Sequence, residues 1–188
     1  MTNVVIKQLP NALTTLRLLL AAPICLLILD ENYSAVLWIA LIAGISDAVD
    51  GWLARKLNIE SRYGSIVDPL SDKVMLISSY LAFAVVGLVP WWVAVIIVAR
   101  DAVIVSGALV YYGLFGRYEV APSIWGKTST TVQIVFALML LTQQVYPVLP
   151  TLSFQIGLWL LIFMTIVSGC HYVYIWGCKA LSQQNHMD

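Results

Sequence analysis

Long apolar runs separated by short polar breaks dominate this chain. Residues 128–178 contain no Lys, Arg, Asp or Glu and are broken near 146–150, and residues 74–99 are equally uncharged. A helix needs roughly 20 apolar residues to cross a bilayer. The pattern therefore predicts six transmembrane helices, at roughly 10–29, 34–56, 65–87, 91–113, 126–146 and 151–177. Residues 2–9 are expected to form a short, weakly amphipathic helix on the membrane surface.

The composition fits an all-α integral membrane protein. Of the 188 residues, 61% are hydrophobic and 11% are charged, and the mean hydropathy is +0.88. Connections this short leave no room for a separate soluble domain, so we expect a single transmembrane domain over 1–188. The net charge of zero gives no general attraction to nucleic acid. Three cysteines without zinc-like spacing are interpreted as small apolar residues: Cys25, Cys170 and Cys178.

The basic residues predict the orientation in the membrane. The connections near 30–33, 88–91 and 146–151 carry no Lys or Arg. Basic residues gather at the opposite ends of the spans: Lys7, Arg55, Lys56, Arg62, Arg117, Lys127 and Lys179. Because cytoplasmic loops are enriched in Lys and Arg, we expect both termini in the cytoplasm of a multi-pass protein, in a bacterial inner membrane. We expect no cleavable signal peptide, because the first apolar run is long and contains Arg17.

Four aspartates interrupt this apolar background at helical spacing. They belong to one series of small and charged residues: Asp47, Asp50, Gly51, Ala54, Arg55, Gly64, Asp68 and Asp72. A helix turns about 100° per residue, so Asp47 and Asp50 share one face of a helix, and Asp68 and Asp72 share a face of the next. The polar stretch 56–63 between them is short, which predicts a helix hairpin with the carboxylates converging at its cytoplasmic end.

Carboxylates that converge in a membrane protein are costly and usually functional. They cannot all stay ionised at low dielectric without cations, and oxygen ligands favour Mg²⁺ or Mn²⁺. Four carboxylates suit two metal ions, an arrangement that stabilises phosphoryl displacement. Taken alone, two of these residues have simpler alternative roles. Asp68, which precedes Pro69, has the alternative role of a helix cap, and Arg55 has the alternative role of extending its side chain to the lipid head groups.

The aspartate series resembles the signature of the CDP-alcohol phosphatidyltransferase family, with every signature position filled. The resemblance implies a homodimer that transfers a phosphatidyl group from CDP-diacylglycerol to an alcohol and releases CMP, with an active site facing the cytoplasm. It implies that two Mg²⁺ or Mn²⁺ ions are held by Asp47, Asp50, Asp68 and Asp72, with Asp72 also the general base. The CDP site implied by the signature comprises Asp50, Gly51, Ala54, Arg55 and Gly64.

A second polar group bears on the acceptor. Arg100 and Asp101 lie within the fourth predicted span, and a buried arginine normally meets an anion. Neighbouring residues on a helix point about 100° apart, so a direct Arg100–Asp101 pair is expected to be awkward. We expect Arg17, Arg100 and Lys127 to form a basic pocket for a phosphate, with Thr14 and Arg117 nearby. The alternative is a structural Arg100–Asp101 pair with Lys127 reaching the head groups.

Such a pocket indicates an anionic lipid or glycerol phosphate as acceptor. Arg100-Asp101, and Pro122 leading to Lys127, resemble the cardiolipin synthases of the family, which use phosphatidylglycerol. The alternatives are a phosphatidylglycerophosphate synthase, which uses glycerol 3-phosphate, and an enzyme with an inositol phosphate acceptor. From another class, a divalent-cation transporter would need ionisable groups through both halves of the bilayer, whereas here they crowd toward one side.

Overall fold

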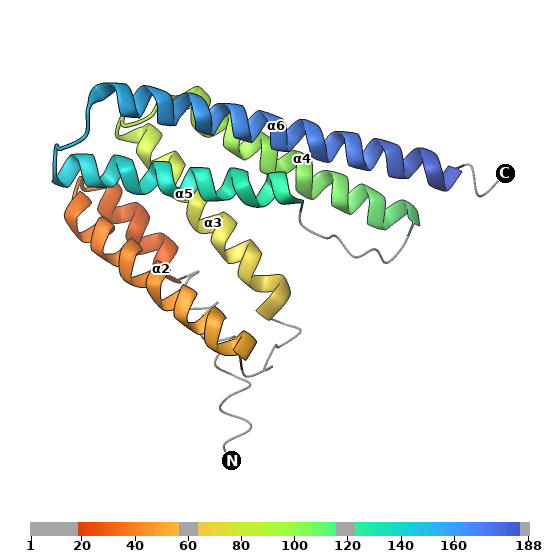
Figure 1. Cartoon of the computed structure of the whole chain (residues 1–188), viewed down its shortest axis with the longest axis horizontal. Coiled ribbons are helices and arrows are strands. Elements are labelled where there is room, and N and C mark those ends of the chain that lie inside the picture. Colours follow the sequence, from red (N-terminus) through yellow and green to blue (C-terminus); the bar gives the residue numbers. More distant parts are fainter. Residues whose placement is uncertain (1–18, 57–63, 116–122, 185–188) are drawn as a thin grey trace, which may run out of the picture. The chain divides into compact units, whose positions relative to one another are not determined.

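The computed structural model describes residues 19–56, 64–115 and 123–184, and these residues form helices joined by short connections (Figure 1). The first described helix covers Leu19–Leu29. The others are α2 (Tyr33–Lys56), α3 (Gly64–Val85), α4 (Trp91–Phe115), α5 (Ile124–Val145) and α6 (Thr151–Gln184). No strand occurs within these ranges. The all-helical fold predicted from the apolar runs is confirmed.

Two tight connections show why the helices end where they do. Before α2, the side-chain oxygen of Asn32 accepts a hydrogen bond from the backbone N–H of Ala35 at 3.3 Å, and so caps the helix. After α3, Gly87 has a φ of 77°, a conformation that glycine adopts without steric cost. The N–H of Leu88 then returns to the carbonyl of Phe83 at 2.9 Å, a common helix-ending pattern.

The chain divides into two compact units. The first comprises Met1–Val89 with Leu138–Val148, and the second comprises Pro90–Ala137 with Leu149–Asp188. In the first unit, Tyr80 and Phe83 are buried and their rings meet edge to face at 5.9 Å. In the second, α4 packs on α6, as Figure 1 shows, and Ile97 and Leu161 are fully buried. A single domain over 1–188 stays a prediction.

Large apolar side chains remain exposed along the helices. Ile42 on α2, Leu109 on α4 and Trp159 on α6 are each more than half exposed. An apolar surface on this scale is expected to contact lipid tails rather than water. Within the described ranges, three helices are long and apolar enough to cross a membrane: Trp91–Val110, Ile124–Val145 and Thr151–Gly177. The six-span count and the cytoplasmic location of the termini stay predictions.

Candidate active site

The aspartate series lies on two consecutive helices of the first unit. Asp47 and Asp50 belong to the second half of α2, and Asp68 and Asp72 belong to the first half of α3. Because the backbone there is helical, a spacing of three or four residues places each pair on one face. The predicted helical placement of all four aspartates is therefore found in the structure.

Most side chains of the series lie outside the described residues. This holds for the three predicted metal ligands other than Asp72, and for the rest of the predicted CDP site: Asp47, Asp50, Asp68, Gly51, Ala54, Arg55 and Gly64. Asp72 is described, half-buried on α3 between the buried Ser71 and the half-buried Lys73. Convergence of the four carboxylates, and the role of Asp72 as base, stay predictions.

The donor set of the series fits a hard divalent cation. Its aspartates offer carboxylate oxygens alone, the ligand type that Mg²⁺ and Mn²⁺ prefer. Among the side chains that the structure describes, no group of three or more His, Cys, Asp or Glu residues lies together. The side chains of Asp47, Asp50 and Asp68 lie outside the described residues, so metal binding by the series stays a prediction.

The second polar group differs from the expectation in one respect. Arg100 and Asp101 are 7% and 5% exposed, and Nη1 of Arg100 donates a hydrogen bond to Oδ1 of Asp101 at 2.5 Å. The expectation that neighbouring residues cannot pair comfortably is wrong. Helix geometry fixes the directions of the two Cβ atoms, but the long arginine side chain bends back far enough to reach the short carboxylate beside it.

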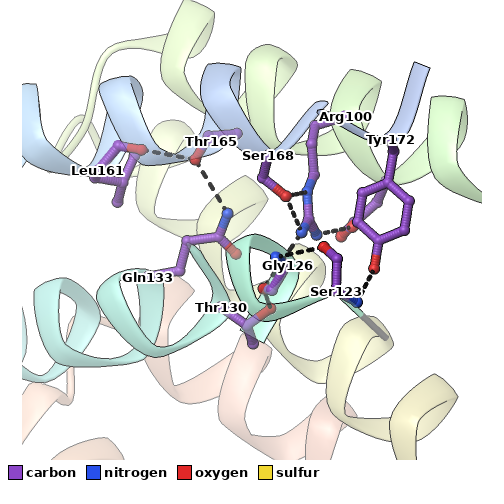
Figure 2. Close-up of polar contacts among 10 residues, drawn as sticks. Arg100, Ser123, Gly126, Thr130, Gln133, Leu161, Thr165, Ser168 and Tyr172 are labelled. Carbon is purple, nitrogen blue, oxygen red and sulfur yellow. Dashed lines mark hydrogen bonds and ion pairs between the residues drawn. The ribbon is translucent and has the colours of Figure 1, made fainter. Parts of the chain in front are cut away.

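Arg100 also connects α4 to the two other helices of the second unit (Figure 2). Its Nε and Nη2 donate to the hydroxyl of Ser168 on α6, at 3.2 and 2.7 Å. Nη2 also donates to the carbonyl oxygen of Gly126 on α5, at 3.4 Å. A buried guanidinium needs both a counter-charge and hydrogen-bond acceptors. Asp101, Ser168 and Gly126 supply them.

The other predicted acceptor residues are only partly described. Lys127 is exposed, directly follows Gly126, and has no ion pair among the side chains that the structure describes. Arg17, Thr14 and Arg117 lie outside the described residues. Arg100 therefore contacts the turn of α5 that carries Lys127. Acceptor binding stays a prediction for all five residues: Arg17, Arg100, Lys127, Thr14 and Arg117.

Sequence reasoning missed several uncharged polar residues that share these contacts. On α6, Thr165, Ser168 and Tyr172 recur at intervals of three and four and are buried. Ser168 accepts from Arg100 on α4, whereas the other two meet α5 or its start: the side-chain amide of Gln133 donates to Thr165 Oγ1 at 3.2 Å, and the backbone N–H of Ser123 donates to the Tyr172 hydroxyl at 3.1 Å. A search for charges passed over them, whereas the helical spacing of polar residues within an apolar run was a usable signal.

Comparison with known proteins identifies the family. The family model described as CDP-alcohol phosphatidyltransferase matches residues 7–167, a range that includes the aspartate series and the Arg100–Lys127 region. The chain is 33% identical over 185 residues to CDP-diacylglycerol–glycerol-3-phosphate 3-phosphatidyltransferase of Bacillus subtilis, covering 88% of this chain and 93% of that protein.

Other relatives carry two different names. The chain is 27% identical over 188 residues to the CMP-forming cardiolipin synthase of Rattus norvegicus, covering 92% of this chain and 62% of that protein. It is 38% identical over 138 residues to a probable phosphatidylglycerophosphate synthase of Mycobacterium tuberculosis, covering 69% of this chain and 64% of that protein. The chain therefore belongs to the CDP-alcohol phosphatidyltransferase family, whose members are transferases of phospholipid synthesis.

Proposed function

We propose that this protein transfers a phosphatidyl group from CDP-diacylglycerol to phosphatidylglycerol and so makes cardiolipin and CMP. The observation that carries the proposal is the complete aspartate series on two consecutive helices, within the region that matches the family. The divalent-cation transporter considered from the sequence is set aside, because the chain belongs to an enzyme family.

The aspartates would hold the metal ions. Asp47, Asp50, Asp68 and Asp72 provide four carboxylates for two divalent ions, Mg²⁺ or Mn²⁺. When bound, such ions neutralise a pyrophosphate and stabilise the attacking and leaving oxygens of a phosphoryl displacement. Small residues beside them would let the CDP group approach the helix backbone, and Arg55 would offset its charge; these residues are Gly51, Ala54 and Gly64, with Asp50 shared between metal and nucleotide.

Asp72 is proposed as the general base. A carboxylate in this position takes the proton of the acceptor hydroxyl while that oxygen forms a bond to the phosphorus of the phosphatidyl group. The bond from this phosphorus to the bridging oxygen of the pyrophosphate breaks at the same time, and CMP departs with the electron pair. Asp72 is half-buried on α3.

The acceptor site is proposed to be basic. Lys127 is exposed, so its ammonium group can contact a phosphate directly. Arg100 acts beside it through the turn of α5 to which it donates. Arg17, Thr14 and Arg117 complete the proposed pocket, and Arg100-Asp101 is the feature that favours phosphatidylglycerol as acceptor.

Glycerol 3-phosphate is the second candidate acceptor. The similarity to the Bacillus subtilis enzyme supports it, because it extends over 93% of that protein. The charge of the pocket does not separate the two acceptors, since a phosphodiester and a phosphomonoester are both anions. A site at the cytoplasmic face of a bacterial inner membrane, in a homodimer, is part of the same proposal.

One experiment tests the proposed reaction. The purified protein is given CDP-diacylglycerol and Mg²⁺ or Mn²⁺ with either phosphatidylglycerol or glycerol 3-phosphate, and CMP and the lipid product are identified. Cardiolipin formed together with an equal amount of CMP supports the proposal. Efficient use of glycerol 3-phosphate alone would replace phosphatidylglycerol by the second candidate, and CMP formation with an inositol phosphate alone would exclude both acceptors.

A further inference from the structure

We propose that Tyr172 is a positioning residue for the acceptor: its hydroxyl holds the first turn of α5, and with it Lys127, in place. This inference rests on the proposed function, because it assigns Lys127 to the acceptor site. Tyr172 lies on α6 and is 7% exposed.

A short series of hydrogen bonds connects Tyr172 to Lys127. The Tyr172 hydroxyl accepts a hydrogen bond from the backbone N–H of Ser123 at 3.1 Å. The Ser123 hydroxyl caps α5 by accepting from the N–H of Gly126 at 3.0 Å. The Ser123 carbonyl accepts from the N–H of Lys127 at 3.1 Å. Tyr172 therefore holds the residue from which the first turn of α5 begins.

The fit between Tyr172 and α5 requires a glycine. A Cβ atom added at Gly126 would lie 2.8 Å from the Tyr172 hydroxyl oxygen and 3.1 Å from its Cε2, closer than atoms in proteins normally approach. Glycine thus lets the tyrosine lie directly against the helix backbone. The sequence shows only Gly126-Lys127, whereas the structure explains why a glycine precedes this lysine.

Further contacts hold the same turn from two sides. Arg100 donates to the Gly126 carbonyl and to Ser168, which lies one turn before Tyr172 on α6, and Figure 2 shows these groups around the start of α5. The rings of Trp125 and His171 lie 6.4 Å apart. His171 and Tyr172, which are adjacent on α6, therefore lie against Trp125 and Gly126, which are adjacent on α5. A helix cap alone would need only one of these contacts.

The consequence concerns the acceptor rather than the donor. A lysine side chain is flexible, and binding an anion costs rotamer entropy. A fixed turn limits that entropy cost, because it holds in place the Cα from which the lysine side chain extends. The Tyr172 hydroxyl contacts the backbone of α5, so its removal is expected to weaken acceptor binding while leaving the CDP-diacylglycerol site and the proton transfer unchanged.

The test compares two removals of a tyrosine hydroxyl. Tyr172→Phe should raise the acceptor KM by about 2- to 12-fold, the range for one neutral hydrogen bond, with kcat and the CDP-diacylglycerol KM unchanged. Tyr146→Phe is the matched control, because Tyr146 lies just beyond the other end of α5 and is exposed; it should change neither KM. An unchanged acceptor KM in Tyr172→Phe, or an equal rise in both KM values, overturns the inference.

Gly126→Ala provides a second variant at the same contact. It should also raise the acceptor KM, and its combination with Tyr172→Phe should raise it by less than the product of the two single effects, because both act on one contact. Effects that simply multiply would contradict the shared contact. A fall in kcat and thermal stability without a change in acceptor KM would indicate a structural role alone and would also overturn the inference.

A measurement without turnover separates this inference from the proposed function. A spin label is attached at Lys127→Cys after Cys25, Cys170 and Cys178 are replaced by alanine, and its mobility is measured with and without Tyr172→Phe. Greater mobility in the Tyr172→Phe variant supports positioning of the turn, and unchanged mobility overturns it. If the wild-type protein transfers to neither acceptor while the mobility still rises, the proposed function fails and the positioning of the turn by Tyr172 stands.

Discussion

The two polar regions of this protein balance charge in different ways. The aspartate series of α2 and α3 has four carboxylates and one arginine in its signature positions, so it carries excess negative charge. The cluster around Arg100 is balanced within the protein, because Asp101 supplies the counter-charge and Ser168 and Gly126 accept hydrogen bonds. In a protein with so few charges, the first arrangement is expected to bind cations from outside, whereas the second holds three helices together.

The largest effects should come from the first region. Asn in place of Asp47, Asp50 or Asp68 removes a negative charge from the proposed metal site and should lower the rate by several orders of magnitude, about 10³-fold or more. A chelator should abolish wild-type activity, and Mg²⁺ or Mn²⁺ should restore it. Rates of CMP release measure both. Full activity in the chelator would contradict the metal site, and normal membrane insertion of each variant is the control.

Asp72→Asn should separate chemistry from binding. The variant keeps three of the four proposed metal ligands but lacks the base, so transfer should be lost while some binding of CDP-diacylglycerol remains. Binding is measured directly with labelled CDP-diacylglycerol, and transfer is measured as lipid product. A rate close to that of the wild type would exclude Asp72 as the base.

The second region should respond through stability. Arg100→Ala leaves the buried Asp101 without its arginine partner and should destabilise the fold by about 3–5 kcal/mol. Arg100→Ala combined with Asp101→Ala removes both charges and should recover part of that loss. Thermal unfolding in detergent compares the three proteins. A double variant less stable than Arg100→Ala alone would contradict the idea that the two charges balance each other.

Lys127→Ala should have a smaller effect than these variants, confined to the acceptor. Loss of one hydrogen bond to a charged group costs about 1.5–3 kcal/mol, which is roughly 10- to 200-fold in acceptor KM. Thermal stability should hardly change, because the side chain is exposed. Steady-state rates with each substrate varied in turn measure the effect. A rise in the KM for CDP-diacylglycerol instead would move Lys127 to the donor site.

The same contrast explains what could be predicted from the sequence. Apolar length predicted the helices closely: helices were expected at 34–56 and 126–146 and are found as α2 (Tyr33–Lys56) and α5 (Ile124–Val145). The span expected at 151–177 is found as Thr151–Gly177, and the helix that contains it, α6, continues through polar residues to Gln184. Hydropathy reports burial in lipid, and the end of a helix depends on its capping residues.

The candidate site was predictable only where charge marked it. The aspartates stand out because ionised groups are rare in an apolar chain, and their spacing of three and four predicted the faces they share. Tyr172 and Ser168 carry no charge, so only their helical spacing within an apolar run marks them in the sequence. Their roles depend on the residues opposite them, Ser123 before α5 and Arg100 on α4, and no local pattern records such long-range pairings. The Arg100–Asp101 pair was misjudged because backbone directions alone ignore the reach of arginine.

The most direct test of this contrast is the number of Mn²⁺ ions bound, measured by electron paramagnetic resonance on the purified protein with CDP-diacylglycerol present. We expect two ions per chain in the wild type, fewer in Asp68→Asn, and two in Lys127→Ala. Two results would contradict the assignment of the aspartates as the metal site. One is a wild-type protein that binds no Mn²⁺ and also shows no Mg²⁺ binding when the two ions compete. The other is an Asp68→Asn variant that binds as many ions as the wild type.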